Sequence, residues 1–254
     1  MTTEKKRLDE LLLARGLVAD LQEARALIAA GQVLAAERVA DKCGHKYALD
    51  CPLRLRKRLG YVSRGGLKLE KALSHFSINP HGWRCLDIGA STGGFTDCLL
   101  QHGAARVYAV DVAYGQLDWK LRGDHRVVVM ERVNARHLKP GDIAKEIDLA
   151  VLDASFISLT RLIPALSPFF HGLRRLIVLV KPQFELAAAQ VAAGGVVRDE
   201  GLRREAVAKV AHFAASLGLR DLGAVASPIL GPKGNQEFLL YLTDSPVADA
   251  RASE

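Results

Sequence analysis

The sequence is poor in cysteine, and the few cysteines it has are not paired. Cys43, Cys51, Cys85 and Cys98 form no CxxC motif, which argues against a disulfide scaffold and against a standard structural zinc site. A zinc site built from Cys43, His45 and Cys51 remains an alternative of non-standard spacing. We expect reduced thiols and no metal.

Long apolar runs are missing as well. No stretch approaches the roughly 18 to 20 apolar residues that cross a bilayer. Residues 1–7, MTTEKKR, lead into a charged helix and lack the apolar centre of a signal peptide. We therefore expect a cytoplasmic protein that does not contact membranes.

Acidic residues are absent from one basic stretch. Between Asp50 and Glu70 there is none, and the basic residues there are Arg54, Arg56, Lys57, Arg58, Arg64 and Lys68. Residues 1–66 hold 13 Lys and Arg against 8 Asp and Glu, so they carry most of the formal net charge of +7. Such a cluster favours contacts with phosphates, although a solvated charged face is the alternative.

What the sequence does contain is typical of a globular chain. It has 254 residues, of which 49% are hydrophobic and 25% are charged. This is enough for one large domain or two unequal ones with a sizeable core.

Residues 85–100, CLDIGASTGGFTDCLL, read as a short strand, a glycine-rich turn and the start of a helix. Glycine permits the unusual backbone angles of such a turn and the close approach of a ligand. The free N–H groups of the helix point back at the turn. The stretch therefore predicts a nucleotide-like cofactor, with an ordinary strand–turn–helix as the alternative.

The spacing of this motif separates two kinds of cofactor. A dinucleotide site has G-x-G-x-x-G, whereas here the middle glycine is Ser91 and a carboxylate, Asp87, precedes the turn. Asp87 would repel a pyrophosphate and attract an ammonium group. The arrangement resembles motif I of class I S-adenosylmethionine (SAM) methyltransferases. Asp111, at the end of the expected next strand, would take the ribose hydroxyls.

The rest of this half alternates short apolar runs with helical segments. Such alternation predicts an α/β fold with a Rossmann-like, doubly wound, mostly parallel sheet, whose ligand lies at the carboxyl ends of the strands. We expect a last long helix over 199–217 and a tail over 245–254. The expected strands are 83–88, 106–111, 126–130, 148–153, 175–180, 223–230 and 236–243.

The N-terminal residues form a separate pattern. Helical periodicity over 7–15 stops at Gly16, and Asp20 can cap a second helix that ends at Gly31, before a short strand from 32. This small α+β unit resembles an S4 domain, an RNA-binding module, on residues 7–18 and 23–33. Where S4 domains turn through Asn-Gly, this chain has residues 35–38, AAER. The resemblance implies RNA contacts by Arg7, Arg15, Arg25 and Lys42.

Polar residues stand where strands of the second half begin or end. Asp153 and Lys181 each follow an aliphatic run, and Glu237 begins a strand. With Lys68 they form a possible catalytic set, and structural ion pairs are the alternative.

The motifs in combination resemble the TlyA family over nearly the whole chain. They are the SAM motif together with residues 61–69 (YVSRGGLKL), 152–159 (LDASFISL), 180–185 (VKPQFE) and 231–237 (GPKGNQE). The resemblance implies an S4 domain over 1–61 and an FtsJ-like methyltransferase domain over 62–244. It further implies SAM-dependent methylation of cytidine 2′-hydroxyls in 16S or 23S ribosomal RNA (rRNA), on ribosomal subunits. Some members of this family carry the name haemolysin.

The same resemblance assigns roles to residues. The catalytic set is Lys68, Asp153, Lys181 and Glu237. The expected cofactor-binding residues are Asp87, Gly89, Ala90, Ser91, Thr92, Gly93, Gly94, Phe95, Asp111, Val112, Asn134 and Asp153. The expected RNA-binding residues are those of the S4 resemblance, Arg7, Arg15, Arg25 and Lys42, together with those of the basic stretch, Arg54, Arg56, Lys57, Arg58 and Arg64. Two other functions stay open, a non-catalytic rRNA-binding assembly factor and a membrane-lytic protein.

Overall fold

The computed structural model describes residues 4–29, 31–55, 60–144 and 146–245. The predicted RNA-binding residues Arg56, Lys57 and Arg58 lie outside these ranges, as does most of the expected tail. The chain divides into two compact units, residues 1–59 and residues 60–254.

The first unit packs two helices against short strands. Helices α1 (Leu8–Ala14) and α2 (Leu21–Ala29) accompany a three-stranded sheet of β2 (Val33–Ala35), β3 (Arg38–Val39) and β5 (Leu53–Leu55). Strands β1 (Lys5–Arg7) and β4 (Lys46–Ala48) form a separate antiparallel pair. Asp20 accepts a hydrogen bond from Glu23 N at 2.7 Å, as expected of a helix cap.

The turn that lacks Asn-Gly is nevertheless a tight hairpin. Ala35 pairs with Arg38, so the loop is the two residues Ala36 and Glu37. Both have positive φ, 46° and 64°, which a twisted two-residue hairpin requires and which Asn-Gly usually supplies. The chain accepts this backbone strain without glycine.

The second unit is built on a seven-stranded sheet of order β11-β12-β10-β9-β6-β7-β8. Only β12 runs antiparallel to its neighbours. The strands are β6 (Arg84–Ile88), β7 (Arg106–Asp111), β8 (Val127–Glu131), β9 (Leu149–Leu152), β10 (Arg175–Val180), β11 (Arg220–Ala226) and β12 (Phe238–Thr243). The predicted α/β fold with a doubly wound, mostly parallel sheet is confirmed.

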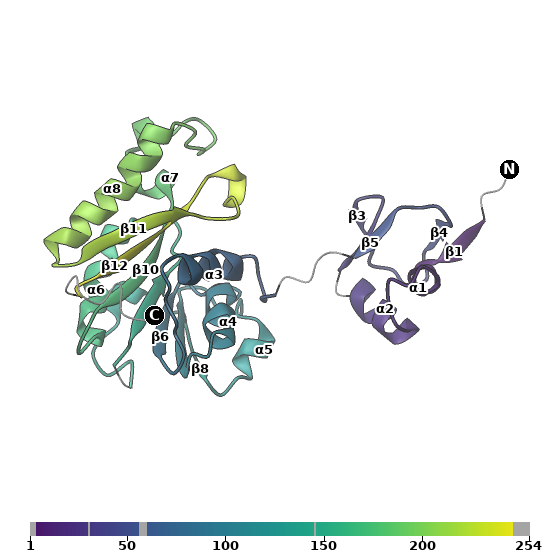
Figure 1. Cartoon of the computed structure of the whole chain (residues 1–254), viewed down its shortest axis with the longest axis horizontal. Coiled ribbons are helices and arrows are strands. Elements are labelled where there is room, and N and C mark those ends of the chain that lie inside the picture. Colours follow the sequence, from purple (N-terminus) through teal and green to yellow (C-terminus); the bar gives the residue numbers. More distant parts are fainter. Residues whose placement is uncertain (1–3, 30, 56–59, 145, 246–254) are drawn as a thin grey trace. The chain divides into compact units, whose positions relative to one another are not determined.

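Helices cover both faces of this sheet (Figure 1), with α3 (Gly65–His75), α4 (Gly94–Gln101) and α5 (Trp119–Arg122) on one face. On the other face lie α6 (Ile163–Leu166) and α8 (Glu200–Ser216). Alternate strand residues belong to the two cores: Ile177 and Leu179 face α3 and α4, whereas Val178 and Val180 face α8. The continuous apolar run of β10 therefore reflects burial on both sides. The short α7 (Pro182–Glu185) and the 3₁₀ turns η1 (Ala135–His137), η2 (Leu159–Arg161), η3 (Ser167–Phe169), η4 (Ala188–Gln190) and η5 (Pro232–Gly234) complete the unit.

One expected strand is misplaced. The first closing strand was predicted over 223–230, but β11 ends at Ala226, and residues 227–231 form a loop. The hydrophobic residues Ile229 and Leu230 gave these positions the appearance of a strand. They instead line a cavity.

Candidate active site

The turn after β6 depends on left-handed backbone at three positions. Gly89, Ser91 and Gly93 have φ of 81°, 50° and 95°. A Cβ on Gly89 would lie 2.6 Å from the backbone oxygen of Asp153, so close packing also requires glycine there. Ser91, the exception, donates its N–H to Asp111 Oδ2 at 2.8 Å. The turn is thereby fastened to the end of β7.

The segment before α3 is held against the start of α4. The buried carboxylate of Asp97 accepts the N–H of Val62 at 2.8 Å. A Cβ on Gly94 would come within 2.3 Å of Ser63 Oγ. The residues that lead into α3 therefore lie directly on the helix that begins at the glycine-rich turn.

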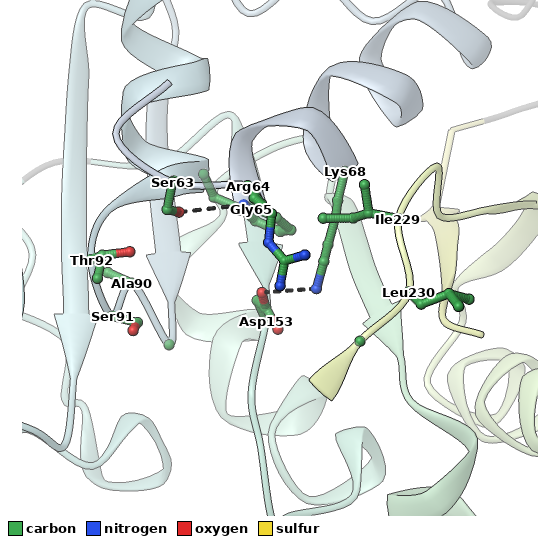
Figure 2. A pocket seen from close by; sticks show the side chains of 14 residues that line it. Ser63, Arg64, Gly65, Lys68, Ala90, Ser91, Thr92, Asp153, Ile229 and Leu230 are labelled. Atoms are coloured by element: carbon green, nitrogen blue, oxygen red, sulfur yellow. Dashed lines mark hydrogen bonds and ion pairs between the residues drawn. The ribbon is translucent and has the colours of Figure 1, made fainter. Parts of the chain in front are cut away.

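A cavity of about 340 Å³ opens between these parts. Figure 2 shows Arg64 and Lys68 extending from the α3 segment toward Asp153, and Leu230 at the far side. Seven predicted cofactor-binding residues line the cavity: Gly89, Ala90, Ser91, Thr92, Gly94, Phe95 and Asp153. Sequence analysis missed Ile229, Leu230 and Gly231 because it placed two of them in a strand.

The four predicted catalytic residues converge in a row. Lys68 Nζ lies 2.6 Å from Glu237 Oε2 and 3.9 Å from Asp153 Oδ2, and Lys181 Nζ lies 2.6 Å from Asp153 Oδ1. The order is Glu237–Lys68–Asp153–Lys181. Both lysines and Glu237 are buried, while Asp153 is partly exposed at the cavity. Because two cations face two anions, each buried charge is compensated.

Lys181 has a second partner that sequence analysis missed. Its Nζ donates to Ser155 Oγ at 2.8 Å. Ser155 follows Asp153 by two residues, and the next residue, Phe156, takes a positive φ of 66°. Its position inside the LDASF motif is the one feature of the sequence that could have indicated a role for Ser155 at this site. Asp153 and Ser155 together fix the Lys181 ammonium group.

Glu237 is held by a loop that closes over it. A Cβ on Gly231 would lie 2.2 Å from Glu237 Oε1, so only glycine fits above the carboxylate. Asn235, also buried, accepts the N–H of Val197 at 2.9 Å and donates to the carbonyl of Gly195 at 2.7 Å. This side chain ties the loop that carries Glu237 to the segment between α7 and α8. Sequence analysis did not assign it a role.

Asp87, expected among the cofactor-binding residues, lies in the interior of the second unit. It is fully buried and does not line the cavity, because its Oδ2 accepts the hydroxyl of Thr96 at 2.7 Å on the α4 side. Its Oδ1 is buried without a hydrogen-bond partner. Burial raises the pKa of this carboxyl to about 7, against the lowering effect of the Thr96 hydrogen bond.

Four other expected cofactor residues do not line the cavity. Asp111 accepts N–H groups of Ser91 and Ala113 at 2.8 and 2.7 Å, so its carboxylate shapes the turn. Gly93 packs against Leu121 inside the turn. Val112 is exposed after β7, and Asn134 caps the 3₁₀ turn η1 by accepting Arg136 N at 3.1 Å.

The predicted RNA-binding arginines of the first unit are engaged within the unit. Arg7 and Arg25 share the fully buried Asp9 at 2.9 and 3.2 Å. The hydrogen bond from Arg7 is the main cause that lowers the pKa of Asp9 to about 2. Arg54 pairs with Glu37 at 2.6 Å. These guanidinium groups remain partly exposed, and each retains unused donors.

The other predicted RNA-binding residues are placed differently. Arg15 donates to the carbonyls of Leu49 and Cys51, so it braces the turn after β4. Lys42 is exposed. Arg64 belongs to the second unit and lines the cavity.

The residues that the structure describes offer neither a metal-binding cluster nor a membrane-spanning helix. Among them no three His, Cys, Asp or Glu side chains are arranged to hold a metal ion, which leaves the suggested zinc site at Cys43, His45 and Cys51 without geometric support. No helix within the same ranges is long and apolar enough to cross a bilayer.

Comparisons with known proteins agree with this geometry. The family model described as FtsJ-like methyltransferase matches residues 61–243. The chain is 48% identical over 242 residues to a Mycobacterium tuberculosis protein named 16S/23S rRNA (cytidine-2′-O)-methyltransferase TlyA, covering 94% of this chain and 90% of that one. It is 47% identical over 244 residues to a Bacillus subtilis protein named as a candidate rRNA methyltransferase, YqxC, covering 95% and 87%. A solved structure from Streptococcus thermophilus, named as a candidate hemolysin, is 42% identical with a TM-score of 0.74, covering 96% and 91%.

Proposed function

The chain belongs to the FtsJ-like methyltransferase family and, within it, to the TlyA proteins, and we propose that it methylates the 2′-hydroxyl of cytidines in rRNA, using SAM. The observation that carries the proposal is the buried row Glu237–Lys68–Asp153–Lys181 beside the cavity. A row of this kind suits a hydroxyl of high pKa, because a fixed ammonium group stabilises the negative charge that develops on the oxygen.

The residues around the cavity fit SAM. A volume of about 340 Å³ lies within the range of small-ligand sites, about 300 to 1,000 Å³. The glycine-rich turn brings backbone atoms to the cavity wall, and Ser91 and Thr92 add hydroxyl groups. When bound, SAM supplies a methyl group activated by a positive sulfonium. Ser63, Ser91 and Thr92 would hold its polar parts, and Asp111 would act through the turn.

Lys181 is the central group of the mechanism. Its Nζ, held by Asp153 Oδ1 and Ser155 Oγ, orients the 2′-oxygen of the substrate and stabilises its developing charge. Lys68 neutralises the opposite side of Asp153, and Glu237 in turn neutralises Lys68. Because these charged side chains are already in position, they need not rearrange during the reaction. The rate of methyl transfer then depends mainly on how well the 2′-oxygen is aligned with the methyl group.

The substrate is rRNA, as named for the TlyA relative, either free or in ribosomal subunits, and the reaction takes place in the cytoplasm. The first compact unit, an S4-like domain on its sequence pattern, supplies RNA affinity through its basic residues. The second unit carries out the transfer.

The test is transfer of labelled methyl groups from SAM to ribosomal subunits. We expect transfer by the unaltered protein and none by Lys181→Ala, with SAM affinity nearly unchanged in calorimetry because Lys181 does not line the cavity. Lys71→Ala, at an exposed position of α3, is the matched control and should remain active.

The same experiment separates the alternatives. A non-catalytic assembly factor would bind subunits without transferring label. Full activity of Lys181→Ala would contradict the mechanism even if the unaltered protein is active.

A further inference from the structure

Large side chains are exposed along one short connection of the second unit. Val112, Tyr114 and Trp119 are 69%, 68% and 84% exposed. Val112 and Tyr114 lie in the connection between β7 and α5, and Trp119 is the first residue of α5. Folded proteins seldom leave such side chains together in water, and where they do the surface usually binds something.

This connection is held in place. Gly115 donates its N–H to Glu131 Oε1 at 3.0 Å, and Arg132 donates its N–H to the carbonyl of Ala113 at 3.1 Å. Arg122 pairs with Glu131 from the α5 side. The aromatic rings are therefore presented on a fixed backbone, and their exposure does not arise from a loose loop.

Positive charge accompanies the rings. The guanidinium carbon of Arg132 lies 4.2 Å from the centre of the Tyr114 ring. Arg132 adopts a positive φ of 59°, a conformation that costs energy for a non-glycine residue. Lys120, next to Trp119, is mostly exposed, and its Nζ lies 3.6 Å from Asp97 Oδ1. We call Tyr114, Trp119 and Arg132 the aromatic platform.

The platform adjoins the cavity wall. Asp118 donates its N–H to the carbonyl of Thr92 at 3.1 Å, and Ser91 Oγ donates to Gln116 Oε1 at 3.2 Å. Ser91 and Thr92 both line the cavity. Gln116 and Asp118, which contact them, lie between Tyr114 and Trp119 in the sequence.

We infer that the aromatic platform stacks unpaired RNA bases next to the methylated nucleotide. The inference rests on the proposed function. Single-stranded RNA is bound by exposed aromatic rings and guanidinium planes that stack on bases, with cations nearby for phosphates. The combination of two exposed rings with Arg132 and Lys120 matches that chemistry, whereas a purely apolar protein partner would not require the cations.

The test compares variants of the full chain for binding to ribosomal subunits and to a single-stranded cytidine-rich RNA oligonucleotide. Tyr114→Ala and Trp119→Ala should each weaken RNA binding about tenfold, in line with the contribution of one stacked base. Tyr114→Phe and Trp119→Phe should keep most of the affinity, because they keep a ring. Leu222→Ala, at an exposed apolar position of the distant edge strand β11, should bind as the unaltered protein does.

Three outcomes would overturn the inference. Equal RNA affinity of the alanine variants would show that the rings do not stack on bases. A parallel loss of SAM affinity in calorimetry would assign the rings to the cofactor. Ultraviolet cross-links from residues 114–119 to a ribosomal protein, with none to rRNA, would replace RNA by a protein partner. If the unaltered protein binds RNA but transfers no methyl groups, the proposed function is wrong, whereas the binding comparison still tests whether the rings stack on bases.

Discussion

Two carboxylates, Asp87 of β6 and Asp153 directly after the neighbouring strand β9, lie in different surroundings. Asp153 faces the cavity between two lysines, whereas Asp87 is fully buried and accepts one hydrogen bond, from Thr96. The lysines compensate the charge of Asp153. Asp87 has no cation within its hydrogen-bonded shell, so burial dominates and raises its pKa to about 7.

This difference predicts a pH dependence of stability. The pKa of Asp87 is about 7 in the folded chain against an ordinary 3.8, so the folded state binds more protons between these values. The free energy of unfolding should therefore fall as pH rises from about 4 to about 7, by on the order of a few kcal/mol, and then level off. Asp87→Asn should remove this fall, as measured by denaturant unfolding at pH 5 and pH 8.

The control for this measurement is Glu205→Gln, which removes an exposed carboxylate of α8. It should keep the pH dependence of the unaltered protein. A pH dependence in Asp87→Asn equal to that of the unaltered protein would show that Asp87 ionises normally.

The sequence could predict that these residues meet, because Asp153 and Lys181 follow parallel strands whose carboxyl ends share one edge of the sheet. Glu237 reaches the same edge because β12 runs antiparallel to β10 and begins there. The sequence could not predict that Ser155 holds Lys181, or that Asp87 turns toward Thr96. Both depend on which of several side-chain directions the packing of α4 and the loop after β9 allows.

Among the larger elements, the loop between β11 and β12 does most to complete the site. It places Ile229 to Gly231 at the cavity and Glu237 beneath Gly231. Asn235 fastens it to Gly195 and Val197. The position of Glu237 therefore depends on a segment that is distant in sequence.

We predict that Asn235→Ala lowers kcat at least tenfold and weakens SAM binding less, because only the side of the cavity formed by Ile229 to Gly231 is disturbed. The loss of both hydrogen bonds frees the loop and shifts Glu237 away from Lys68, whereas the glycine-rich turn stays intact. Steady-state methyl transfer and calorimetry measure the two effects. Asn235→Asp is the matched variant: it still accepts from Val197 N and should retain more activity than the alanine variant. Equal, full activity of both would show that the clamp is dispensable.

The ends of β11 could not be predicted from the sequence: the expected strand was 223–230, and the observed strand is Arg220–Ala226. Ile229 and Leu230 resemble the end of a strand by composition, and only the structure shows that they line the cavity. By contrast, β7 and β10 were predicted with correct ends, because long aliphatic runs buried on both faces leave little ambiguity.

At the scale of the whole molecule, each unit has its own core. Leu8, Leu12 and Ile28 belong to the core of the first unit, which shares no buried residue with the two cores of the second. Deletion of residues 1–59 should therefore leave the second unit folded and able to bind SAM.

The deletion should also weaken rRNA binding and flatten its salt dependence, because phosphate contacts release counterions. Binding titrations at two or more salt concentrations measure this. As the control, Lys42→Gln in the full chain, at an exposed position, should reduce the salt dependence partly. An unchanged affinity of the truncated chain for RNA would give the basic unit another role.

The most direct measurement is the position of the transferred methyl group. After reaction with labelled SAM, rRNA is digested to nucleosides and the labelled product is identified by mass spectrometry. The row Glu237–Lys68–Asp153–Lys181 predicts a 2′-O-methyl group, because a fixed ammonium group stabilises the charge on a reacting hydroxyl and no cysteine lines the cavity to activate a base carbon. The name of the TlyA relative makes cytidine the expected nucleoside. A methyl group on the base would contradict the account.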